Sequence, residues 1–156
     1  MKDTRFSKFS LLWGLVFIIF GAISTNCSKT ADPDFAKEIE GSYTYTVKAN
    51  GVLQTGTGRC TLTRNNATSV TYRDEEGNMP IPNLFKDGSG IYGITGQYQG
   101  TADGLAYTGN PPSNLQSVGG KPYNFYYDPS TRRFITTQVV TINRQVFILE
   151  ITATRI

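Results

Sequence analysis

Apolar and polar residues alternate along much of the chain after residue 40, which is the pattern of half-buried β-strands. In residues 43–48, two Tyr and a Val share one face, and two Thr and a Lys share the other. Asn50-Gly51 follows, and because a type I′ turn needs positive φ at both central positions, this pair predicts a tight hairpin. Residues 145–156 alternate in the same way and predict a final strand, one face of which carries Phe147, Leu149, Ile151 and Ala153.

Turn-forming residues divide the rest of this region into further short strands. Residues 65–66, the polar tip at 75–78 and the Asp-Pro pair at 128–129 separate segments that again alternate. Only residues 34–40 carry a helical signal, with Asp34 as a suitable N-cap. The pattern therefore predicts an all-β fold with a short N-terminal helical turn. About eight strands would form an antiparallel meander, closed into a β-barrel or folded into a β-sandwich.

One apolar segment, residues 79–85, breaks the alternation. It contains Pro80 and Pro82, and because proline cannot donate a ladder hydrogen bond, a central strand is not expected there. The segment predicts either a loop packed over one end of a barrel or a flap at the mouth of a pocket.

The N-terminal residues follow a different pattern, with basic residues first, an apolar run at residues 11–20, and small or polar residues up to Cys27. This arrangement is typical of an export signal. A retained anchor and ordinary cleavage after Ser24 are the alternatives to a lipoprotein. A Cys at the cleavage point favours the lipoprotein, with a signal peptide at residues 1–26, a tether and helical turn at 27–40, and a β-domain at 41–156.

Residues 23–27 resemble a bacterial lipobox, with Ser24 where Leu is usual and Asn26 where a small residue is usual. The resemblance implies that Cys27 receives a thioether-linked diacylglycerol and, on its new amino group, a third acyl chain such as palmitate. More than one acyl chain is enough for stable membrane attachment without a spanning helix. We therefore expect an exported protein that is lipid-anchored to the bacterial envelope at the outer membrane.

Composition narrows the possible functions. The first 26 residues contain three basic residues and one acid, so they account for two of the chain's three net positive charges. The remaining domain of about 130 residues is nearly neutral, and nucleic-acid binding loses its electrostatic support. The chain contains no His, which excludes Ser-His-Asp and Cys-His catalysis and the commonest transition-metal ligand.

The remaining chemistry-bearing residues have ordinary structural interpretations. The Asp and Glu residues lie mainly in turns, where carboxylates are solvated or bond their own backbone. With Cys27 lipidated, Cys60 has no disulfide partner, and its strand-like surroundings predict a buried thiol. We expect a protein that is not an enzyme, with no catalytic residues, metal or cofactor.

Gly41-Ser42-Tyr43, which opens the first strand after the helical turn, resembles the Gly-x-Trp motif of lipocalins with Tyr in place of Trp. In that family the aromatic residue plugs the closed end of the barrel, and a basic residue near the end of the chain packs over it. The resemblance implies a lipocalin-like β-barrel in which Tyr43 and Arg155 pack at the barrel end. The chain also resembles exported Gram-negative lipoproteins with one lipocalin-like domain.

The aromatic content predicts ligand binding, because Tyr rings line apolar pockets and stack on sugars. We expect the barrel to bind a small apolar or amphipathic molecule at a mouth formed by Ile81, Leu84, Phe85, Tyr92, Tyr98 and Tyr107. One alternative is a surface glycan-binding β-sandwich with exposed aromatics in a flat row. Another is a structural subunit of an envelope complex. The sequence leaves the ligand's identity, the partner proteins and the oligomeric state open.

Overall fold

The computed structural model describes residues 33–102, 104–142 and 144–156, which belong to one compact unit, Pro33–Ile156. The predicted signal peptide and the predicted lipidation site Cys27 lie outside the described residues. The unit is nearly all β, with one short helix near its N-terminal end.

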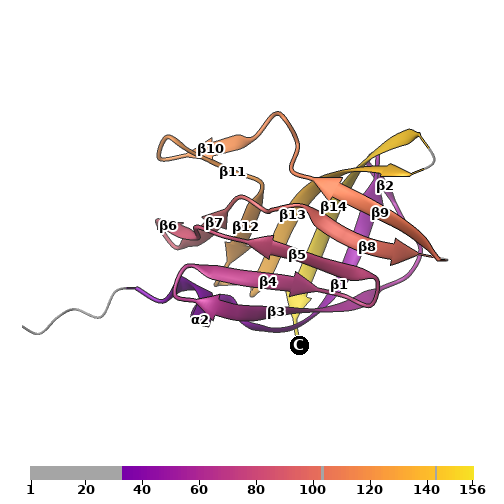
Figure 1. The fold of residues 1–156 in the computed structure, drawn as a ribbon. Coiled ribbons are helices and arrows are strands. Elements are labelled where there is room, and N and C mark those ends of the chain that lie inside the picture. Colours follow the sequence, from indigo (N-terminus) through magenta and orange to yellow (C-terminus); the bar gives the residue numbers. More distant parts are fainter. Residues whose placement is uncertain (1–32, 103, 143) are drawn as a thin grey trace, which may run out of the picture. The chain divides into compact units, whose positions relative to one another are not determined.

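Within the described residues, eight strands form a closed antiparallel barrel (Figure 1). The ring closes because β14 pairs with β1 along one edge and with β13 along the other. The prediction of an eight-stranded antiparallel barrel is confirmed. In the order of pairing, the strands are β1 (Gly41–Ala49), β3 (Gly58–Asn66), β4 (Ser69–Arg73), β5 (Gly77–Ile81), β8 (Tyr98–Ala102), β9 (Leu105–Asn110), β13 (Arg133–Ile142) and β14 (Gln145–Arg155).

The hairpin predicted at Asn50-Gly51 is confirmed. Both residues have positive φ, 49° at Asn50 and 82° at Gly51, as a type I′ turn requires. The chain returns as the short strand β2 (Val52–Leu53), which pairs with the end of β1. The Asn50 side chain also accepts a 2.9 Å hydrogen bond from the backbone N–H of Ile148, which ties the turn to β14.

The barrel wall forks along β13. The N-terminal part of β13 pairs with β12 (Phe125–Asp128), and its C-terminal part pairs with β9. From β12 the sheet continues outward through β7 (Gly90–Gly93) to β6 (Phe85–Asp87). A separate hairpin of β10 (Gln116–Val118) and β11 (Lys121–Tyr123) lies beside this extension (Figure 1).

Buried polar side chains fill the fork. Asn124 accepts a 2.9 Å hydrogen bond from the backbone N–H of Thr95 and donates to the Thr95 hydroxyl at 2.6 Å and to the Thr137 carbonyl at 2.9 Å. The amide nitrogen of Gln138 donates to the same Thr95 hydroxyl at 2.5 Å. These bonds satisfy backbone groups where the β-ladder changes partner, which is where a buried sheet would otherwise leave them unpaired.

The expectation that residues 79–85 form only a loop is wrong for their first part. Strand β5 includes Pro80, which lies opposite Thr71 of β4. The proline is tolerated because β5 pairs with β8 only at Gly77 and Asn78, so Pro80 needs no N–H on its other edge. On that edge the Pro80 carbonyl accepts a 2.6 Å hydrogen bond from the Gly96 N–H.

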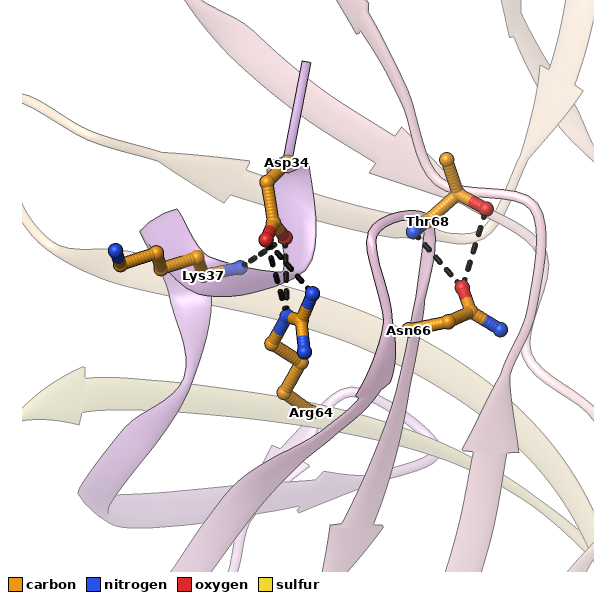
Figure 2. Close-up of polar contacts among 5 residues, drawn as sticks. All are labelled: Asp34, Lys37, Arg64, Asn66 and Thr68. Carbon is orange, nitrogen blue, oxygen red and sulfur yellow. Dashed lines mark hydrogen bonds and ion pairs between the residues drawn. The ribbon is translucent and has the colours of Figure 1, made fainter. Parts of the chain in front are cut away.

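The predicted helical turn is confirmed as α2 (Phe35–Ile39), which packs against β3 and β4. Asp34 caps the helix by accepting a hydrogen bond from the Lys37 N–H at 3.1 Å, and the same carboxylate forms an ion pair with Arg64 of β3 at 2.9 Å (Figure 2). In the adjacent β3–β4 turn, Asn66 accepts from the Thr68 N–H (Figure 2). The ion pair is exposed, so we expect it to orient the helix more than to stabilise the fold.

Aromatic rings form the centre of the barrel core. Phe134 of β13 contacts Tyr43, Phe125 and Tyr72, with ring centroids 5.0, 5.4 and 6.2 Å apart. All four side chains are fully buried. Cys60 is buried as well, and burial raises the pKa of its thiol to about 12, so the reactive thiolate is scarce at neutral pH.

The fork makes a prediction about stability. Asn124→Ala removes three hydrogen bonds and leaves the Thr95 N–H and the Thr137 carbonyl without them, so we expect unfolding to become easier by about 3 kcal/mol. Urea denaturation followed by circular dichroism measures the change. Asn114→Ala, at an exposed position, is the matched control and should change stability by less than about 0.5 kcal/mol. Equal effects of the two substitutions would show that the fork network contributes little.

Candidate binding site in the barrel mouth

Inward-facing side chains leave a cavity of about 80 Å³ in the barrel, called the mouth cavity below. A water molecule's share of liquid volume is about 30 Å³, whereas drug-sized ligands occupy pockets of about 300 Å³ or more. The mouth cavity therefore suits a group of a few non-hydrogen atoms. It is lined by Tyr45, Val47, Tyr72, Asp74, Glu76, Tyr98, Tyr107, Gln138, Val140, Leu149 and Ile151.

Four tyrosines form a continuous run of rings around this cavity. The rings of Tyr98 and Tyr107 are stacked, with centroids 5.6 Å apart and an angle of 26° between their planes. Tyr72 lies 6.4 Å from Tyr98, and Tyr45 lies 6.5 Å from Tyr72. A Cβ at Gly100 would come within 2.4 Å of a Tyr98 ring atom, so glycine is needed there for the two rings to stack.

Two carboxylates face these rings. Asp74 accepts hydrogen bonds from the hydroxyls of Tyr72 at 2.9 Å and Tyr98 at 2.8 Å, and Glu76 accepts one from the hydroxyl of Tyr107. Asp74 also accepts the backbone N–H groups of Glu76 and Gly77, which fixes the turn between β4 and β5. Asp74 thus has most of its acceptor capacity occupied, whereas Glu76 is exposed and keeps free lone pairs.

Gln138 contributes an acceptor without a donor. Its side chain is 1 % exposed, and its amide nitrogen donates a hydrogen bond to the Thr95 hydroxyl in the fork. Its carbonyl oxygen, Oε1, is buried and has no hydrogen-bond partner among the described residues. A buried amide oxygen left unpaired costs about 1–3 kcal/mol, so this cavity wall favours an occupant that donates a hydrogen bond.

The tyrosine hydroxyls stay protonated at physiological pH. Burial raises the pKa of Tyr45 to about 12, with the Asp74 and Glu76 charges adding to the effect. Burial also raises the pKa values of Tyr72, Tyr98 and Tyr107, in each case with a contribution from the nearby carboxylates. The rings therefore present neutral phenols, which donate to carboxylates and offer electron-rich faces to a ligand.

The structure separates the residues predicted for the mouth into three places. Tyr98 and Tyr107 line the mouth cavity. Ile81 and Leu84 are buried in the core near Gly93, away from that lining. Phe85 and Tyr92 lie in the β6–β7 extension outside the ring of eight strands.

Nine of the eleven lining residues were not predicted as site residues, and four of the nine are the aromatic and acidic residues Tyr45, Tyr72, Asp74 and Glu76. Alternation placed Tyr45 with Tyr43 on one strand face, so its inward direction could have been read from the sequence. The same alternation applies to Tyr72, which shares a buried face with Val70. Asp74 and Glu76 read as solvated turn acids, because nothing local indicated that distant tyrosine hydroxyls would reach them.

The residues expected at the barrel end lie together. Tyr43 is fully buried, and its hydroxyl donates a 2.5 Å hydrogen bond to the carbonyl of Ile39 at the end of α2. Arg155 is the cross-strand partner of Tyr43 and donates to the Glu38 carbonyl at 3.3 Å. A Cβ at Gly41 would lie 2.9 Å from Arg155 Nε, so the missing side chain of Gly41 leaves room for the guanidinium.

A second candidate site lies on the sheet extension and is called the outer aromatic row. Phe85, Tyr92 and Tyr126 are opposite one another in register on β6, β7 and β12, and their rings are stacked with centroids 5.6 and 5.0 Å apart. Tyr123 meets Tyr92 edge-on, and the Lys121 ammonium lies 5.1 Å from the Phe85 ring centre. All four rings are partly exposed.

A groove of about 560 Å³ continues from this row. Tyr123 and Tyr126 belong to both features. The other lining residues come from β10, β13, β14, the loop before β10 and the position between β11 and β12, and many of them are polar: Pro112, Ser113, Asn114, Gln116, Asn124, Ile135, Thr137, Val139, Ile148 and Glu150. Aromatic rings beside amide and hydroxyl groups suit a ligand with both apolar faces and hydroxyls.

No protein-family model matches the chain, and no curated protein matches it. In the part of the chain that the structure describes, no three His, Cys, Asp or Glu side chains are grouped closely enough to hold a metal ion. Within those same residues, no helix is long and apolar enough to cross a membrane.

The raised tyrosine pKa values predict weaker folding at alkaline pH. Unfolded tyrosines ionise near pH 10, while the folded barrel keeps its phenols protonated to about pH 12 at Tyr45. The unfolded chain therefore loses protons first, and the free energy of unfolding should change little between neutral pH and about pH 9 and fall between about pH 10 and pH 12. Urea denaturation across this range measures it.

Tyr45→Phe is the matched control for this prediction. It removes one ionisable group and keeps the ring, so the decline should become shallower while stability at neutral pH changes little. A decline of unchanged steepness would exclude Tyr45 as a contributor.

Proposed function

We propose that this chain is a non-catalytic, lipocalin-like lipoprotein that binds a small amphipathic ligand in the mouth cavity. The single observation that carries the proposal is the composition of the cavity wall. Apolar side chains of Val47, Val140, Leu149 and Ile151 adjoin tyrosine hydroxyls, two carboxylates and an unpartnered amide oxygen. Such a mixture of apolar surface and a few polar groups is typical of small-ligand sites.

The size of the cavity defines the ligand further. At about 80 Å³, the cavity takes a ligand, or one end of a ligand, of a few non-hydrogen atoms. A long acyl chain needs more room than the tyrosine rings leave. Small ligands gain at most about 1.5 kcal/mol per non-hydrogen atom, so we expect affinities from micromolar to millimolar.

A binding role is favoured over catalysis by the state of the polar groups. The chain contains no His. Asp74 already accepts four hydrogen bonds, and burial holds the phenols protonated near neutral pH. The groups that line the cavity are suited to holding and orienting a ligand.

The lipocalin-like assignment and the tether are part of the same proposal. The contacts of Gly41, Tyr43 and Arg155 at the barrel end match what the lipocalin motif implies, and the closed eight-stranded barrel is the architecture of that family. The export signal and the lipobox-like residues 23–27 support anchoring through Cys27 to the outer membrane.

The proposal predicts saturable binding of small amphipathic probes. The full chain, purified in detergent, is titrated with n-butanol, n-butylammonium and butyrate while tyrosine fluorescence is followed. Leu149→Phe fills the cavity and should weaken binding of the preferred probe at least about tenfold, or about 1.4 kcal/mol. Val146→Phe, on the exposed face of the same strand, is the control and should leave binding unchanged.

Two results would contradict the proposal. One is the absence of saturable binding for all three probes. The other is equal binding by wild type and Leu149→Phe, which would place any bound probe elsewhere. The same preparation tests the anchor, since its intact mass should correspond to a chain that begins at Cys27 and carries acyl chains. An unlipidated start at Thr25 would remove the tether.

The outer aromatic row favours a second candidate function, binding of a surface glycan. Partly exposed aromatic rings in register across β6, β7 and β12 offer apolar surface of the kind that packs against sugar rings. The adjoining groove adds amide and hydroxyl groups that hydrogen-bond to sugar hydroxyls. This function and small-ligand binding in the barrel use different surfaces.

Glycan binding predicts retarded migration in native gels that contain soluble polysaccharides. Tyr92 stacks on both Phe85 and Tyr126, so Tyr92→Ala should lower affinity by on the order of 1 kcal/mol, about fivefold, and restore migration. Leu53→Ala, exposed on β2, is the control. Migration of the wild type that no polysaccharide alters would eliminate this candidate.

A further inference from the structure

The mouth cavity is acidic. Asp74 and Glu76 both line it, and among the described residues no Lys or Arg does. Asp74 also lines a neighbouring hollow together with Arg59, Arg73 and Glu75, whereas Glu76 does not line that hollow. Two carboxylates without a basic partner in the wall favour a positively charged occupant and repel an anionic one.

The tyrosine rings favour the same charge. Ring faces carry negative potential, and a cation within about 6 Å of a ring centre gains about 0.5–2 kcal/mol per contact. Tyr45, Tyr72, Tyr98 and Tyr107 surround a space so small that any occupant lies near several of them. Burial keeps these phenols neutral, so the tyrosines act on a cation through their ring faces and not through a phenolate charge.

The unused acceptors specify hydrogen-bond donors on the ligand. Gln138 Oε1 is buried without a partner among the described residues, and Glu76 has accepted only the Tyr107 hydroxyl. A quaternary ammonium satisfies neither acceptor, whereas a primary ammonium group carries three N–H donors. A divalent metal ion fits poorly, because the carboxylate oxygens of Asp74 already accept four hydrogen bonds and are not free to coordinate it.

We infer that the mouth cavity recognises the ammonium group of a small primary amine, whose alkyl or aryl part contacts the apolar side chains of the cavity wall. This inference rests on the proposed function and names the chemical class of its ligand. Asp74 and Glu76 supply the negative charge that attracts the ammonium group, and the four tyrosines supply ring faces for cation–π contacts. The unpaired Gln138 oxygen accepts a hydrogen bond from an ammonium N–H. Glu76 is exposed, so the cation keeps part of its hydration and the desolvation penalty is reduced.

Three probes of equal chain length test the assignment on the full chain in detergent. We expect n-butylammonium to bind at least about tenfold more tightly than n-butanol, and butyrate to bind most weakly. Raising the salt concentration should weaken binding of n-butylammonium and leave n-butanol unaffected. Isothermal titration calorimetry measures all three affinities.

Paired variants locate the recognition. Glu76→Gln should weaken n-butylammonium about tenfold and leave n-butanol unchanged, whereas Glu75→Gln, at the neighbouring exposed position outside the cavity, should alter neither. Tyr107→Leu should weaken the ammonium probe about fivefold, and Tyr107→Phe, which keeps the ring, should retain at least half the wild-type affinity. Circular dichroism confirms that each variant is folded.

Each outcome separates this inference from the proposed function. Equal binding of n-butanol and n-butylammonium, with no effect of Glu76→Gln, overturns the ammonium assignment while the proposed function stands. Tighter binding of butyrate does the same. Absence of binding by all three probes, which corresponds to a cavity that holds only water, overturns both.

Discussion

The fold depends on one strand, β13, that pairs with two different neighbours along the same edge. Its first residues pair with β12 and its last with β9, so the ladder must change partner inside the barrel. Asn124, Thr95 and Thr137 satisfy the backbone groups left between the two pairings. Gln138 completes the network with its nitrogen, and this orientation leaves its oxygen without a partner in the cavity wall. The hydrogen-bond network at the fork thus also supplies a polar group to the candidate site.

Filling by aromatic rings determines what the barrel can hold. An eight-stranded barrel is just wide enough for side chains to fill or for one small ligand to enter. Here Tyr43, Tyr72, Phe125 and Phe134 are fully buried in the core, and a space of about 80 Å³ remains beside the outer tyrosines among the described residues. The larger concave surface lies outside the barrel, under the β10–β11 hairpin, where the sheet extension presents its own rings. The two sites therefore differ in the size of ligand that they can hold.

Local sequence signals predicted most of the architecture. Alternation placed Tyr45 and Val47 on one face of β1, which the structure turns inward, and Asn50-Gly51 forms the predicted turn with positive φ at both positions. Asp34 caps the predicted helical turn. Pro80 misled the prediction because its effect depends on which edge of the strand is paired, and that is decided by β8 diverging from β5 after two residues. Periodicity reports the face of a strand but not the identity of its neighbours.

The sequence by itself determined the strand faces, the turns and a nearly neutral, His-free domain, because these follow from composition and short-range periodicity. Only the tertiary structure decided which aromatic residues meet. It placed Tyr98 and Tyr107 with Asp74 and Glu76 in the barrel, Phe85 and Tyr92 on the outer row, and Ile81 and Leu84 in the core. The reason is physical: strand pairing brings together residues that are 24 or more positions apart, as in the hydrogen bond from Tyr98 to Asp74, and no local pattern encodes such a contact.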